Sequence, residues 1–356
     1  METNVYISTQ GGGIRGINQC TLLTFIELAL KQITGEDKSI ADYCDGFAGC
    51  SVGSIVAVLL ALGKNFDGED KHIKASEILQ LLYDEGEHVF KKQVCSCGGF
   101  LRSKYTSAGL QHILEEKLED IYQYRPKLSD IAKPVIVNSA DVDTNKIILF
   151  KSENAKKRVN TDYYIDDTIL ASTAAPSYFP SHIMWNVAGT KRLNCTDGGI
   201  TGHNNPSLLL KNEILRWNKD SNKKSVLINV GTGVKRINEE RLNIKEKSGI
   251  FTWPFKDFFN TILSVPGDAT DYTIRADNTI EYINLTADLV YADSAMDNTK
   301  KSNLRALVED GVKYVNDNFK SFMDIVTIIC NAKGIQVKEV SKNMLINEFY
   351  QVFSPK

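Results

Sequence analysis

The feature that most constrains this chain is the pentapeptide Gly49-Cys50-Ser51-Val52-Gly53, which places a serine between two glycines. A short apolar stretch, residues 47–48, precedes it, and the apolar run 54–62 follows with the character of a helix. At a strand-to-helix turn the serine is held in a strained backbone conformation with its hydroxyl clear of the sheet. Glycines on both sides let strand and helix approach closely. The pattern predicts a nucleophile elbow, although a helix start capped by Ser51 has the same sequence.

The composition is that of an ordinary globular chain with a large core. Of 356 residues, 42% are hydrophobic and 24% are charged. The formal net charge of −2 lacks the basic surplus of a general nucleic-acid binder, so nucleic acid is not an expected partner. Seven cysteines are an odd number, and no paired CxxC spacing indicates zinc, so we expect reduced thiols.

The sequence contains no segment expected to enter or cross a membrane. The amino terminus lacks the basic flank and apolar run of a secretory signal. No stretch approaches the roughly 18 uninterrupted apolar residues of a spanning helix. We therefore expect a cytoplasmic protein with peripheral membrane association.

A second glycine-rich turn comes earlier in the chain. The apolar stretch 5–8 leads into Gly11-Gly12-Gly13-Ile14-Arg15-Gly16, and a helical pattern follows up to Gly35. Backbone N–H groups in such a turn point in one direction and form a cradle for an anion. A nucleotide phosphate site, a structural turn and an oxyanion hole all fit this loop, but no Lys-Ser/Thr follows as in a P-loop. The predicted elbow on the next strand favours the oxyanion hole.

Together these two motifs resemble the patatin-like phospholipase family, and later stretches extend the resemblance over residues 4–235. The family's middle strand pair is similar to residues 133–137 and 147–152, and its Ala-Ala-Pro-x-x-Phe signature is similar to residues 171–180. The family's aspartate loop is similar to residues 194–199 and 204–206, and the strand end after it is similar to residues 229–233.

The departures from the family pattern remove no catalytic group. Gln10 stands where many members carry Asp or Ser, Cys50 replaces the usual Thr, and Ser54 replaces a common second Gly. Cys50 itself is a candidate thiol nucleophile, but we expect a small buried side chain that points away from the cleft.

The resemblance implies an α/β fold, with three α/β/α layers and a mainly parallel central sheet. It also implies that Ser51 is the nucleophile and that Asp197 takes its proton directly, without a histidine. The implied oxyanion hole consists of the N–H groups of Gly11, Gly12 and Gly13, together with that of Val52. Structural glycines are implied at Gly49, Gly53, Gly198 and Gly199.

Three residue types near these motifs have alternative interpretations. Arg15 is implied to contact a phosphate or to stabilise the glycine loop, whereas a surface ion pair would make it structural. Asp197 precedes two glycines, which is also typical of a turn aspartate. His203 and His182 are the candidates for a conventional triad, but an exposed loop and local packing explain them better, so we assign neither a catalytic role.

We expect a catalytic domain over residues 1–290 and a helical extension over 291–356 that packs on the same domain. The charged stretch 235–249 predicts a surface linker. The aromatic stretch 251–259 predicts either a membrane-contacting rim or the buried face of a helix. Residues 303–322 and 341–353 have the spacing of helices, whereas 325–330 fits a helix or a strand.

The sequence therefore predicts a serine ester hydrolase that cleaves fatty-acyl esters of glycerophospholipids, a phospholipase A. Its expected partners are a phospholipid or other acyl lipid and a transient membrane surface. No metal or other cofactor is implied, since neither a calcium loop nor a ligand-spaced His/Cys set is present. The alternatives are a lipase or transacylase for neutral glycerides or galactolipids, and a non-catalytic lipid-binding regulator. The oligomeric state is not predicted.

Overall fold

A computed structural model describes residues 3–63, 72–93, 102–219, 221, 223–235 and 255–354, with side chains of the helix beginning at Phe255 described from residue 265 onward. Within these residues the strands form one eight-stranded sheet, in the order β5-β6-β3-β2-β1-β7-β8 with β4 beside β3. The strands are β1 (Thr3–Thr9), β2 (Gly46–Gly49), β3 (Val135–Asp141), β4 (Lys146–Lys151), β5 (His182–Trp185), β6 (Arg192–Asp197), β7 (Lys224–Val230) and β8 (Glu281–Leu285).

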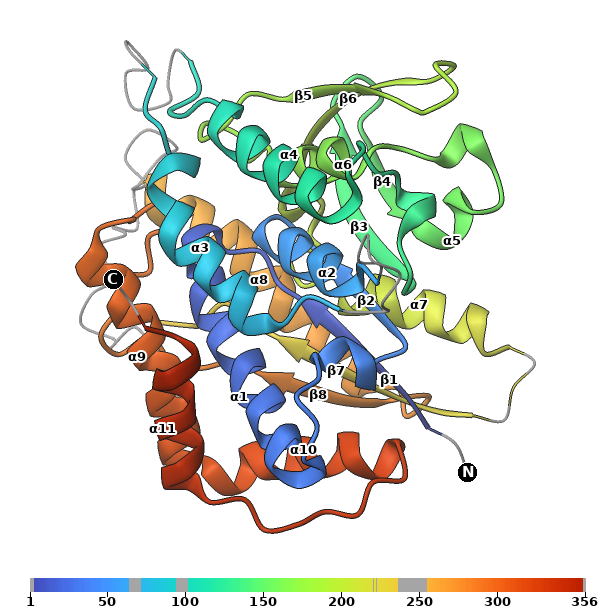
Figure 1. Ribbon diagram of the computed structural model, residues 1–356. Coiled ribbons are helices and arrows are strands. Elements are labelled where there is room, and N and C mark those ends of the chain that lie inside the picture. Colours follow the sequence, from blue (N-terminus) through green and yellow to red (C-terminus); the bar gives the residue numbers. More distant parts are fainter. Residues whose placement is uncertain are drawn as a thin grey trace.

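Helices cover both faces of the sheet (Figure 1). They are α1 (Gly16–Thr34), α2 (Val52–Ala61), α3 (Ala75–Val89), α4 (Ala108–Tyr122), α5 (Ser152–Ala155), α6 (Ile165–Thr173), α7 (Ser207–Trp217), α8 (Phe255–Arg275), α9 (Lys301–Asp317), α10 (Phe319–Ala332) and α11 (Lys342–Val352). Strand β1 pairs in parallel with β2 and β7, and the next pairs outward, β2 with β3 and β7 with β8, are also parallel. The expected α/β/α fold with a mainly parallel sheet is confirmed.

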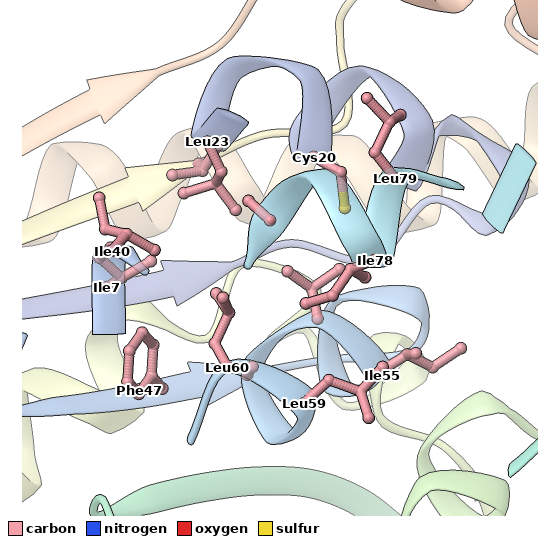
Figure 2. Close-up of a cluster of buried hydrophobic side chains, with 14 of the residues drawn as sticks. Ile7, Cys20, Leu23, Ile40, Phe47, Ile55, Leu59, Leu60, Ile78 and Leu79 are labelled. Carbon is pink, nitrogen blue, oxygen red and sulfur yellow. The ribbon is translucent and has the colours of Figure 1, made fainter. Parts of the chain in front are cut away.

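The alternation of residues along β1 explains why the sheet has a helix layer on each face. Successive side chains of a strand point to opposite faces. Val5 and Ile7 belong to the larger hydrophobic cluster, with α1, α2 and α3, whereas Tyr6 belongs to a second cluster with α7 and α8. Figure 2 shows the larger cluster, with Ile7 and Phe47 beside side chains of α1, α2 and α3.

The last three helices pack against α1 and share its hydrophobic cluster (Figure 1). The Phe25 ring of α1 stacks on Phe349 of α11, with centroids 4.5 Å apart, and meets Phe322 of α10 edge-on at 6.5 Å. The 291–356 extension thus contributes to the core that covers one face of the sheet. The boundary at residue 290 stays a prediction.

The single helix expected over residues 303–322 is instead two helices, α9 and α10. They meet at Asn318, whose φ of −115° and ψ of 31° are not helical. Its side-chain amide donates to the Tyr314 carbonyl at 3.1 Å, a local bond that competes with the helical backbone pattern. Residues 325–330, which fitted either helix or strand, belong to α10.

Two sequence expectations cannot be compared with the structure. The predicted linker 235–249 lies outside the described residues except for Lys235, and so do residues 251–254 of the aromatic stretch. Residues 255–259 belong to the described backbone of α8, but their side chains are not described. Among the described helices, none is long and apolar enough to cross a membrane.

A buried carboxyl group connects α1 to the start of α3. Glu27 of α1 is 5% exposed, and it accepts the N–H of Ile40 at 2.9 Å and that of Ala75 at 2.9 and 3.0 Å. Ala75 is the first residue of α3, whose amides have no partner within the helix. Burial is the largest influence on the Glu27 carboxyl and raises its pKa to about 8, although these amide hydrogen bonds act in the opposite direction.

Substitutions at Glu27 test this connection by thermal unfolding. Glu27→Ala leaves two buried amides without an acceptor, which costs about 1–3 kcal/mol for each group and lowers the Tm. Glu27→Gln keeps an acceptor oxygen and lowers the Tm less. A raised folded-state pKa means that stability falls as the pH rises toward about 8. Glutamine cannot ionise, so the Tm difference shifts in favour of Glu27→Gln as the pH rises from about 5 to about 8. A shift in favour of the unsubstituted protein would contradict the raised pKa, and the exposed Glu339→Gln serves as control.

Candidate active site

Ser51 occupies a strained turn between β2 and α2. Its φ of 52° and ψ of −128° lie on the positive-φ side that side chains rarely adopt. A Cβ atom on Gly49 would overlap the carbonyl of Gly53, and one on Gly53 would overlap the carbonyl of Thr9 at the end of β1. Only glycines therefore permit this close approach of β1, β2 and α2, and the turn has the strand-to-helix geometry that the pentapeptide predicts.

Buried polar groups hold the Ser51 backbone in place. The Ser51 N–H donates to the Ser172 hydroxyl at 3.0 Å, and that hydroxyl donates to the Asn138 carbonyl at 2.8 Å. Ser172 and Asn138 are at most 1% exposed. Neither residue was expected from the sequence to have a role, although Asn138 interrupts an apolar strand, which is a recognisable signal for a supporting polar residue.

Asp197 lies at the end of β6, beside Ser51. Its carboxylate accepts the Gly199 N–H at Oδ1, at 2.7 Å, and the neighbouring Ser51 side chain acts on the same carboxylate as a donor that lowers its pKa. The residue is 5% exposed. Burial raises the Asp197 pKa to about 6, and the two hydrogen bonds oppose this rise only in part. A carboxylate with this pKa is ionised at neutral pH yet more basic than an ordinary aspartate.

The loop after Asp197 is fixed against β3. A Cβ atom on Gly198 would overlap the Asn138 carbonyl, so glycine is needed for the close contact. In return, the Asn138 side-chain amide donates to the carbonyls of Gly198 and His203, at 3.1 and 3.2 Å. The predicted structural roles of Gly198 and Gly199 thus correspond to a close backbone approach and to an N–H donated to Asp197.

One of the four predicted oxyanion donors is already occupied. The Gly11 N–H donates to the Asn204 carbonyl at 3.1 Å, and Gly11 does not line the cavity beside Ser51. An amide bonded to a carbonyl is not free for an oxyanion, so Gly11 is corrected from a donor to a structural residue. The amides of Gly12, Gly13 and Val52 have no acceptor among the hydrogen bonds of the described residues, and all three residues line the cavity with Ser51.

Arg15 supports the glycine loop from behind. Its Nε donates to the Gly12 carbonyl at 3.2 Å, and its side chain is half-buried. Burial lowers the pKa of the guanidinium to about 10, which the neighbouring Tyr178 partly opposes. Arg15 does not line the cavity. Of the two roles implied for Arg15, this position favours the loop contact over the phosphate contact.

The Cys50 thiol makes a contact that the sequence did not predict. Cys50 is fully buried and does not line the cavity, in keeping with the expected small buried side chain. Its Sγ, however, lies 4.0 Å from Asp197 Oδ1. Burial and the nearby carboxylate raise the thiol pKa well above its usual value, so the group is a neutral S–H, a weak donor to Asp197.

Ser51 and Asp197 line a largely apolar cavity. Its volume is about 1020 Å³ including the open mouth. The apolar walls come mainly from α2, α3 and α4, through Ile55, Leu82, Val89, Leu110, Ile113 and Leu114. Apolar walls with a few polar groups at one end are typical of sites that bind apolar ligands.

The histidines named in the sequence analysis lie apart from this arrangement. Neither His182 nor His203 is among the described residues that line the cavity. His182 Nε2 lies at hydrogen-bonding distance, 2.8 Å, from Asp167 Oδ1. His203 is half-buried, and burial lowers its pKa. Within the described part of the chain, no group of three or more His, Cys, Asp or Glu residues could hold a metal ion.

A family model and several relatives that match this chain all indicate the same protein family. The model of the Patatin-like phospholipase family matches residues 7–210. Patatin group J-1 of Solanum tuberosum is 27% identical over 87% of this chain and 83% of its own length. Patatin-like proteins 1 and 2 of Arabidopsis thaliana are 25% and 28% identical, over 87% and 86% of this chain and 81% of each relative.

The raised pKa of Asp197 predicts how Ser51 reactivity depends on pH. The ionised carboxylate is the form that accepts a proton, so the rate of Ser51 labelling by a fluorophosphonate should fall below a midpoint near the Asp197 pKa of about 6 and be constant above it. Cys50→Ser replaces the weak thiol donor by a stronger hydroxyl donor, which favours the charged carboxylate and moves the midpoint to lower pH. An unchanged midpoint in a folded Cys50→Ser variant would show that the thiol does not influence Asp197.

Proposed function

Because this chain belongs to the patatin-like phospholipase family, we propose that it is a phospholipase A that acts through a Ser51 acyl-enzyme. Membership supports lipid acyl hydrolase activity in general. The finer proposal rests on one observation: the Ser51 side chain and the buried carboxylate of Asp197 lie together at an apolar cavity that both residues line.

The proposed reaction begins with attack of Ser51 Oγ on the ester carbonyl carbon. Asp197 takes the hydroxyl proton, and the carbonyl oxygen becomes an oxyanion that accepts hydrogen bonds from the amides of Gly12, Gly13 and Val52. Each such donor contributes about 3–4 kcal/mol to transition-state stabilisation. When the carbon–oxygen bond to the leaving group breaks, Asp197 returns the proton to the departing alkoxide.

Hydrolysis of the acyl-enzyme uses the same groups. Asp197, again ionised, takes a proton from water, whose oxygen attacks the acyl carbonyl. The second oxyanion accepts hydrogen bonds from the same amides. Its collapse breaks the bond to Ser51 Oγ and releases the fatty acid, and Asp197 returns the proton to Ser51. The raised pKa of Asp197 suits both steps, because a stronger base removes protons from hydroxyl and water more readily.

The substrate proposed for this site is a glycerophospholipid held in a membrane surface. The apolar walls of the cavity support binding of one acyl chain. Ile200 lines the cavity and is 41% exposed, and α8, which packs beside the 198–201 turn, exposes Val265 at 58%. Apolar side chains exposed near a cavity mouth are suited to the boundary of a lipid layer, so we propose transient peripheral contact there.

Substitution of the two reacting groups tests the proposal. Ser51→Ala and Asp197→Asn should each lower fatty-acid release from phosphatidylcholine vesicles by about 10³-fold or more, with little change in Tm. His203→Ala should keep most of the activity, and the exposed Asp143→Asn is the matched control for Asp197. Mass spectrometry of the released lipids, with triglyceride and galactolipid emulsions in parallel, identifies the substrate class.

The outcomes separate the proposed function from its alternatives. Release from the neutral emulsions alone would replace the phospholipase by a neutral lipase. Absence of both fluorophosphonate labelling and lipid release in the folded protein would favour a non-catalytic lipid binder. Loss of activity in a folded His203→Ala variant would contradict a mechanism that uses only Ser51 and Asp197.

A further inference from the structure

The loop between β8 and α9 touches the glycine loop although it lies about 280 residues further along the chain. We call residues 290–299 of this loop the strap. The Met296 carbonyl accepts the Ile14 N–H at 2.9 Å. Gly13 has a φ of 59°, and a Cβ atom there would overlap the Met296 carbonyl. The strap and the glycine loop are therefore packed backbone to backbone, and Met296 is one of the residues that line the cavity.

The next residue, Asp297, connects the strap to residues 104–105. Its Oδ2 accepts the Tyr105 hydroxyl at 2.7 Å and forms an ion pair with Lys104. The Asp297 side chain is only 14% exposed. The backbone amides of Lys104 and Tyr105 in turn donate to the carbonyls of Ser177 and Tyr178, both at 2.8 Å.

The segment that residues 104–105 contact forms part of the cavity lining. Tyr178 and Phe179 line the cavity, and the Tyr105 ring packs against both, with centroids 6.4 and 5.7 Å away. Phe90, at the end of α3, packs edge-on against Tyr105 at 5.2 Å. One carboxylate thus connects the strap, the glycine loop and an aromatic wall.

The other end of the strap is fixed on α9. Asp310 is 1% exposed and accepts the amides of Val290, Tyr291 and Ala292 at 2.9–3.0 Å. Asn303 accepts the Asp293 amide at 2.8 Å. Helix α9 packs on α1 in the larger hydrophobic cluster. Because the strap is bonded to this buried helix, it can hold the loops that it contacts in a fixed place.

We propose that Asp297 is a positioning residue for the reaction and that the Met296 side chain determines acyl-chain selectivity. This inference rests on the proposed acyl hydrolase function. Asp297 holds the strap against the 104–105 segment, and the strap fixes the amides of the glycine loop where an oxyanion forms. Small displacements of such donors have large effects on rate, because catalysis depends on preorganised geometry.

Asp297 is tested with Asp297→Ala and Asp297→Asn, with the exposed Asp317→Ala on α9 as control. Asp297→Ala should lower kcat for the soluble ester p-nitrophenyl butyrate about tenfold per folded molecule. Asp297→Asn keeps an acceptor for Tyr105 and should recover part of the loss. Hydrogen exchange at Ile14 and Tyr105 should accelerate in Asp297→Ala, while Val290–Ala292 stay protected by Asp310.

A purely structural role would lower the Tm of Asp297→Ala and leave kcat per folded molecule and exchange at Ile14 unchanged, which would overturn the positioning role. The exchange measurement requires no turnover. An unsubstituted protein that hydrolyses no ester would therefore count against the proposed function, while exchange would still decide whether Asp297 holds the glycine loop.

Met296 is tested by fatty-acid binding, with cis-parinaric acid as the fluorescent probe. Met296→Trp fills part of the cavity and should raise the Kd for this 18-carbon acid about tenfold. It should also lower the ratio of kcat/KM for p-nitrophenyl palmitate over butyrate by a similar factor. The exposed Met344→Trp on α11 should change neither. Equal probe binding by Met296→Trp and the unsubstituted protein, or no binding by either, would overturn the assignment.

Discussion

The close approach of β1, β2 and α2 is the constraint on which the rest of the site depends. Gly49 and Gly53 leave no room for a Cβ atom, because their neighbours there are backbone carbonyls that cannot move aside. The approach forces Ser51 to a positive φ and places the first turn of α2 beside the glycine loop that ends β1. One steric requirement thus positions both the hydroxyl and the amides around it.

The second element of the site is a carboxylate kept out of water. Burial of Asp197 raises its pKa, and hydrogen bonds from Gly199 and Ser51 limit that rise. The surrounding groups differ in strength as donors: Gly199 offers a backbone amide at 2.7 Å, and Cys50 offers only a thiol at 4.0 Å. A carboxylate with few strong donors stays basic, as the proposed role of Asp197 requires.

The site also depends on residues that lie far along the chain from the elbow and the glycine loop. The Asn204 carbonyl accepts the Gly11 amide, and the Met296 carbonyl accepts the Ile14 amide. Ser172 bonds to the backbone of the elbow, and Asn138 bonds to the backbone of the aspartate loop. The carboxyl-terminal helices carry the strap and pack on α1 (Figure 1). The extension is therefore part of the environment of the reacting groups as well as of the core.

The sequence by itself determined the features whose cause is local. Strands β1 and β2, the helices after them and the need for glycine around Ser51 follow from apolar spacing and from sterics within a few residues. The three-layer fold was expected from the resemblance of these and later motifs to a known family. The tertiary structure decided the remaining features of the site, because those features depend on which groups from distant parts of the chain come into contact. The engaged amide of Gly11, the contact between Cys50 and Asp197 and the position of Met296 all arise from packing between separated segments, which no local pattern records.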